Sequence, residues 1–80
     1  MTIEEKHKKD VQFQIECLTQ DLIVMLMKNY GFDMKSAMET LYTSHTYKKI
    51  ENESTGLYYQ GSEYVFSFLE KELDNKKLTI

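Results

Sequence analysis

The side chains that could carry out chemistry are few and lie far apart along this chain. Cys17, the single cysteine, has no histidine at helical spacing that could serve as its base, and His45 stands alone beside Ser44. His7 and Asp10 are one helical turn apart in a lysine-rich segment. A metal centre needs several ligands at defined spacing, and a nucleophile needs an activating base. We therefore expect no enzyme, no catalytic residue, no metal and no cofactor.

The most aromatic stretch, TGLYYQGSEYV at residues 55–65, has the glycine spacing of a phosphate-binding loop, but it lacks the lysine of that loop and no strand is expected before it. The glycines at its ends allow sharp turns on both sides. One interpretation is a plug, with Leu57 and one tyrosine facing the core, and the other is a recognition loop with exposed rings. Both can hold if the stretch is extended, because Tyr58 and Tyr59 would then face opposite ways.

Composition limits the classes of function. The 80 residues are expected to form one domain, residues 1–80, with 41% hydrophobic and 29% charged residues, as is ordinary for a globular chain. The net charge is −3, and all 10 basic residues are lysines. Because arginine supplies the bidentate contacts to phosphate and guanine, its absence weighs against nucleic-acid binding. The longest apolar run, residues 22–27, is too short to span a membrane, and a lone cysteine fits a reducing compartment, so we expect a soluble cytoplasmic protein.

These side chains must be positioned by helices, because the hydrophobic spacing is helical along most of the chain. The first helix is expected to run from a capping box of Thr2 and Glu5 to Tyr30, with Gly31 in the left-handed position that ends a helix. Its inner stripe consists of Val11, Ile15, Leu18, Leu22, Met25 and Leu26. Such a helix would be about 40 Å long, whereas a compact domain of this size is about 30 Å across. Its charged first turns are therefore expected to overhang the rest of the domain.

The opposite face of this helix carries Phe13, Cys17 and Val24. One interpretation is a central helix that its neighbours cover on more than one side, with Cys17 as a buried or half-buried apolar residue. The other interpretation is that these residues form a self-association face. Both fit the spacing of the three residues.

Two shorter helices are expected next. Asp33 and Ser44 are the side chains best placed to cap them, because short polar residues accept hydrogen bonds from the free N–H groups of a first turn. The second helix is expected to bury Met34, Ala37, Met38 and Leu41. The third helix, residues 45 to about 52, is expected to bury Tyr47 and Ile50. A left-handed Gly56 should then stop it.

A fourth helix is expected after Ser62, which can serve as its N-cap. Its inner stripe is expected to contain Val65, Phe68, Leu69 and Leu73, with Tyr64 beside it. Its acidic residues, Glu70, Glu72 and Asp74, are expected to face solvent. This arrangement offers no paired carboxylates in a cleft.

The carboxyl-terminal half contains a pattern made of Leu41, Tyr42, Ser44 and Tyr47, then Thr55, Gly56, Leu57, Tyr58 and Gln60, then Tyr64 and Val65. It resembles a family of short bacterial proteins of unknown function that share Leu-Tyr-x-Ser-x-x-Tyr, then Thr-Gly-Leu-Tyr-x-Gln, then Tyr-Val before a final helix. The likeness covers about residues 37–73, and Gly61 departs from it, since a serine or similar polar residue is expected there. The resemblance implies a small helical bacterial protein with an accessory or antitoxin-like binding role, and it implies no chemistry.

Together, these observations predict an all-α fold, a small bundle of three or four helices with a long amino-terminal helix. The expected function is non-enzymatic protein–protein interaction, either as a homodimer or other homo-oligomer or with a dedicated protein partner. The expected partner-binding residues are Phe13, Cys17 and Val24 on one contact face and Tyr58 and Tyr59 on the other. The alternative is a small DNA-binding regulator in which residues 34–52 form a helix-turn-helix-like pair. Its groove-facing residues would be His45, Thr46, Lys48 and Lys49.

Overall fold

Four α-helices and two 3₁₀ turns make up the computed structural model, which describes residues 3–78, with side chains described for residues 10–75. The elements are α1 (Ile3–Tyr30), α2 (Met34–Tyr42), α3 (His45–Glu51), η1 (Glu53–Thr55), η2 (Leu57–Tyr59) and α4 (Ser62–Leu78). No strand occurs among these residues, so the predicted all-α fold with a long first helix is confirmed. The predicted capping box of Thr2 and Glu5 lies outside the residues whose side chains are described.

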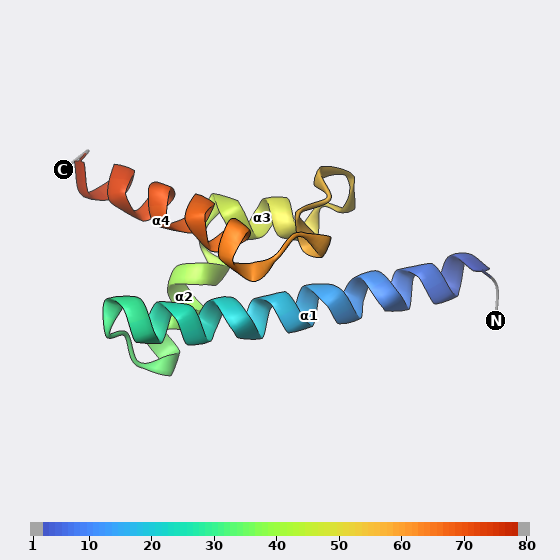
Figure 1. Cartoon of the computed structure of the whole chain (residues 1–80), viewed down its shortest axis with the longest axis horizontal. Helices are drawn as coiled ribbons and strands as arrows, with labels where there is room; N and C mark the ends of the chain where they lie inside the picture. Colours follow the sequence, from blue (N-terminus) through green and yellow to red (C-terminus); the bar gives the residue numbers. More distant parts are fainter. Residues whose placement is uncertain (1–2, 79–80) are drawn as a thin grey trace.

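The long helix α1 runs along most of the molecule, and the other elements lie beside its central and carboxyl-terminal parts (Figure 1). Its 28 residues span about 42 Å, close to the longest extent of the molecule, which measures 48 × 23 × 19 Å. α2 crosses α1, and α3 and α4 lie together on one side of it (Figure 1). The amino-terminal end of α1, drawn in blue, extends beyond the other elements, as the length of the helix predicted.

Local capping explains the first helix boundaries. Gly31 ends α1 with a φ of 71°, and its N–H donates to the carbonyl four residues earlier at 3.1 Å. Asp33 is the N-cap of α2, and its Oδ1 accepts the N–H of Ser36 at 2.8 Å. Ser44 is the N-cap of α3, and its hydroxyl accepts the N–H of Tyr47 at 3.0 Å. These bonds satisfy groups that a helix leaves free at its ends, and the three predicted boundaries are confirmed.

Two other boundaries differ from the prediction. Asn52 caps the last turn of α3, so the left-handed Gly56, with a φ of 69°, ends η1 instead of α3. α4 starts at Ser62 itself, because the N–H of Val65 donates to the carbonyl of Gly61 at 3.1 Å. Gly61 therefore occupies the N-cap position that was predicted for Ser62.

The core lies where the inner face of α1 meets α2, α3 and α4. Its buried residues are Val11, Ile15, Leu18, Leu22, Leu26, Ala37, Leu41, Ile50, Val65, Phe66 and Leu69. The predicted stripe of α1 is confirmed, apart from Met25, which is half-buried. Ile50 of α3 is fully buried, as predicted, and Tyr47 packs against the core while half-buried.

The prediction that Phe68 and Met34 lie in the core is wrong. Phe68 is 37% exposed, whereas Phe66 is 3% exposed. Both flank the same inner stripe of α4, and Phe66 is buried because its ring packs near Tyr30 at the end of α1, with centroids 6.4 Å apart. Met34 is 59% exposed, because α2 crosses α1 and only residues near such a crossing, here Ala37 and Leu41, reach the core.

Candidate functional site

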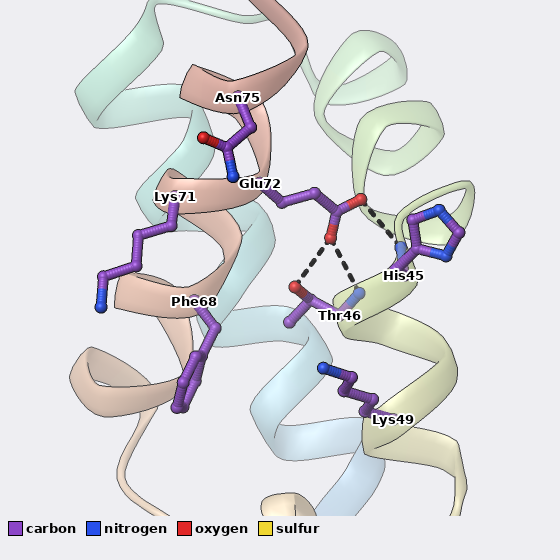
Figure 2. A pocket seen from close by; sticks show the side chains of 7 residues that line it. All are labelled: His45, Thr46, Lys49, Phe68, Lys71, Glu72 and Asn75. Carbon is purple, nitrogen blue, oxygen red and sulfur yellow. Dashed lines mark hydrogen bonds between the residues drawn. The ribbon is translucent and has the colours of Figure 1, made fainter.

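An open pocket of about 470 Å³ lies between α3 and α4. Figure 2 shows its seven lining side chains, with Lys49 projecting from α3 and Lys71 from α4. The lining consists of His45, Thr46, Lys49, Phe68, Lys71, Glu72 and Asn75. Lys49 and Lys71 are exposed, and the Nζ of Lys71 lies 6.0 Å from the centre of the Phe68 ring.

The carboxylate of Glu72 is already used inside the molecule. Its Oε2 accepts the N–H of His45 at 2.8 Å, and its Oε1 accepts the N–H and the hydroxyl of Thr46, both at 2.9 Å (Figure 2). It therefore caps the first turn of α3 from α4. The prediction that Glu72 faces solvent is wrong. The signal was present, since Glu72 follows Leu69 by three residues and Val65 by seven, on the inner face of the helix.

The carboxylate that lines this pocket has a structural role. Glu72 serves as a structural acceptor for Thr46, which is itself only 4% exposed. Across residues 10–75, no three histidine, cysteine or acidic side chains are grouped closely enough to hold a metal ion.

The tyrosine stretch has one side packed on the core and one side exposed. Leu57 and Tyr58 are half-buried and pack against the core, whereas Tyr59 is 63% exposed. The backbone is a 3₁₀ turn and not an extended chain, and the two tyrosine rings meet edge to face with centroids 5.1 Å apart. The hydroxyl of Tyr59 lies only 2.6 Å from where a Cβ on Gly56 would stand. Gly56 thus allows both the left-handed turn and the close approach of the ring.

Four of the five predicted partner-binding residues meet in one groove. Phe13 and Cys17 of α1 and Tyr58 and Tyr59 of η2 line an open groove of about 400 Å³. Phe13 is 65% exposed and Cys17 is also exposed. The interpretation of Cys17 as a buried or half-buried residue is therefore wrong, because η2 lies beside this face of α1 without covering it.

Val24, the fifth predicted residue, lies in a neighbouring groove between α1 and α2. This groove has a volume of about 580 Å³. Its apolar walls include Val24, Met34, Met38 and Tyr42. Sequence reasoning missed Met34 and Tyr42 as surface residues, since it placed Met34 in the core and Tyr42 only in the family pattern.

The two grooves lie on the two flanks of the outer ridge of α1, and we call their exposed apolar residues together the apolar belt. The belt consists of Tyr59, Phe13, Cys17, Val24, Met34 and Tyr42. Among the described residues, seven large hydrophobic side chains are exposed, and five of them belong to the belt. The other two, Tyr64 and Phe68, lie on α4 and stack edge to face on each other.

The residues of the DNA-binding alternative do not share one free face. Thr46 is buried and its hydroxyl donates to Glu72, so it cannot reach a groove of DNA. His45, Lys48 and Lys49 are exposed. The carboxylate of Glu72 also lies at the amino-terminal end of α3, which is the end that contacts base edges in helix-turn-helix proteins.

None of the described helices combines the length and the apolar character that a membrane crossing requires. Comparison of the chain with protein-family models, with curated proteins and with solved structures finds no match.

Proposed function

We propose that this chain is a non-enzymatic protein–protein interaction module that binds its partner through the apolar belt. The observation that carries the proposal is the exposure of five large belt side chains, between 43% and 65% each. These five side chains all line the two grooves along α1, and exposed apolar side chains grouped in this way are typical of a binding surface.

The size of the belt supports a protein partner. Large apolar and aromatic side chains present about 150–250 Å² each, so five that are about half exposed offer on the order of 400 Å². One side of a standard protein interface buries about 800 Å², of which roughly 57% is non-polar. The belt is therefore close to the apolar share of one such side.

The rim of the belt is acidic and polar. Glu16 lines the groove of Val24, and Asp21 lines the groove of Phe13 and Tyr59. Apolar burial would supply most of the affinity, and these carboxylates would favour partners without facing acidic groups. The partner is a second copy of the chain or a dedicated protein. With a dedicated protein, the family resemblance implies an accessory or antitoxin-like interaction in the bacterial cytoplasm.

The proposal is tested by sedimentation velocity over a range of concentrations, together with capture of proteins from the native cell. Val24→Asp and Tyr59→Ala should each weaken self-association or partner capture by about tenfold or more, as expected for central belt residues. Tyr64→Ala removes an equally exposed ring outside the belt and should change neither measurement. A wild-type chain that stays monomeric and captures nothing, or belt variants that bind like the wild type, would contradict the proposal.

A further inference from the structure

The outer ridge of α1 has the spacing of a helix-pairing seam. Phe13, Cys17, Gln20 and Val24 follow one another at intervals of four, three and four residues. This alternation keeps residues on one side of a helix and is the spacing with which two helices pack side by side in a coiled coil. All four residues are exposed, so the seam is open along its whole length.

From this seam we infer that α1 pairs antiparallel with α1 of a second copy, about a two-fold axis that passes between Cys17 and Gln20. The inference rests on the proposed function and names the partner as a second copy. In this register Phe13 lies opposite Val24 of the second copy, and Cys17 lies opposite Gln20. The same two contacts recur across the axis, as a two-fold interface requires.

The flanking charges favour the antiparallel arrangement. In a parallel pair in register, Glu16 of each helix would lie beside Asp21 of the other, which places like charges together twice. In the antiparallel register, Glu16 lies beside Ile23 of the second copy and Asp21 lies beside Gln14. No like charges then meet beside the seam.

The seam alone is too short for a stable pair. From Phe13 to Val24 it is about 17 Å long, and isolated coiled coils need several heptads. The rest of the apolar belt supplies the missing area, because Tyr59 lies on one side of the ridge and Met34 and Tyr42 lie on the other. Gln20, the one polar residue of the seam, would fix the register as polar core residues do in coiled coils.

The single native cysteine allows a direct test by disulfide trapping. The wild-type chain is mixed with the double variant Cys17→Ser/Gln20→Cys, one of them tagged so that the mixed dimer has its own mobility on a non-reducing gel. The antiparallel pair brings Cys17 level with Cys-substituted position 20 of the other copy, whereas two copies of Cys17 are offset along the axis. Because a disulfide needs Cα atoms within about 7 Å, the mixed dimer should form about tenfold faster than either covalent homodimer.

A matched control replaces the double variant with Cys17→Ser/Lys48→Cys, whose cysteine is exposed on α3 away from the belt. This control should give mixed dimer only at the rate of random collision. Since a substitution could disturb the fold, circular dichroism of each variant is compared with the wild type. Sedimentation of Val24→Asp against Tyr64→Asp gives a second readout that needs no cysteine, and only Val24→Asp should shift the protein towards monomer.

Three outcomes would overturn the inference. Faster trapping of wild-type Cys17 homodimers than of the mixed dimer would indicate a parallel pair. A dimer without either disulfide would place self-association on another surface. The third outcome is a monomeric wild-type chain that captures another protein, with capture lost in Val24→Asp and retained in Tyr64→Asp. That result would support the proposed function but would show that the belt binds a different protein instead of a second copy.

Discussion

At the scale of single residues, the carboxylate of Glu72 links α4 to α3, two helices that η1 and η2 separate along the chain. It accepts three hydrogen bonds from His45 and Thr46, all between 2.8 and 2.9 Å. Hydrogen bonds to a charged acceptor are stronger than neutral ones, and a buried donor that loses its acceptor keeps its full desolvation cost. Glu72 therefore stabilises the packing of α3 on α4, and its pocket is a structural joint.

Replacement of this carboxylate should destabilise the fold. Glu72→Ala leaves the buried Thr46 without an acceptor and should lower the free energy of unfolding by about 2 kcal/mol. Urea denaturation followed by circular dichroism measures the change. Glu70→Ala, an exposed position on the same helix, should change it by less than about 0.5 kcal/mol. Equal effects of the two substitutions would show that the joint contributes nothing to stability.

Two phenols give the fold a dependence on alkaline pH. Burial raises the pKa of Tyr30 above its ordinary 10.0, and Glu70 and Asp74 raise it further. Burial also raises the pKa of Tyr47, although its hydrogen bond with Thr19 lowers it in part. The folded chain thus holds these protons more tightly than the unfolded chain, so their contribution to stability is complete below about pH 10 and is lost as the pH rises through the folded pKa values.

The double variant Tyr30→Phe/Tyr47→Phe should therefore lose less stability than the wild type between about pH 9 and pH 11. The measurement is the midpoint of urea unfolding at a series of pH values. Tyr64→Phe serves as the control, since Tyr64 is more than half exposed. Parallel pH profiles of the wild type and the double variant would contradict the assignment.

At the scale of elements, the connections are set by glycines whose conformations differ. Gly31 and Gly56 have φ angles of 71° and 69°, which strain any residue with a Cβ. Only Gly56 also has a side chain against it, the ring of Tyr59, while nothing lies within 4 Å of the Cβ position at Gly31 or Gly61. The turn at Gly56 therefore couples the end of η1 to the position of an apolar belt residue.

Alanine at these three positions should give a graded series. Gly31→Ala should cost about 1–2 kcal/mol for the left-handed backbone alone. Gly56→Ala should cost more, because the ring of Tyr59 must also move, and it should weaken partner binding through the belt. Gly61→Ala should stay within about 0.5 kcal/mol of the wild type. Thermal unfolding measures the stability order, and a Gly56→Ala variant as stable as Gly61→Ala would contradict it.

At the scale of the whole molecule, α1 is longer than its neighbours can cover. The other elements bury one face of α1 and leave the ridge of Phe13, Cys17 and Val24 open. A chain of this length buries little surface alone, so binding through the open ridge would stabilise it as well as give it a function.

If the partner is a second copy, stability should depend on protein concentration by mass action. The melting temperature of the wild type should rise by several degrees over a hundredfold increase in concentration, since about 1 kcal/mol corresponds to about 4–8 °C in a domain of this size. The melting temperature of Val24→Asp should not change with concentration. A wild-type melting temperature that is also constant would exclude self-association over that range of protein concentration.

The sequence by itself determined the features that depend on neighbouring residues. Asp33, Ser44 and Gly31 mark helix ends because a cap or a left-handed turn is a property of a few consecutive residues. The inner stripe of α1 was equally readable, since a long helix repeats its period often enough to fix the buried face.

Only the tertiary structure decided which residues share a surface. Phe66 and Phe68 flank the same short stripe, and Phe66 is the buried one because its ring packs near Tyr30. Glu72 accepts hydrogen bonds from donors that are more than 25 residues away in the sequence. Phe13 and Cys17 lie in one groove with Tyr58 and Tyr59 because the chain returns across α1 after α3. Such contacts depend on how the helices pack in three dimensions, and helical period alone carries no information about them.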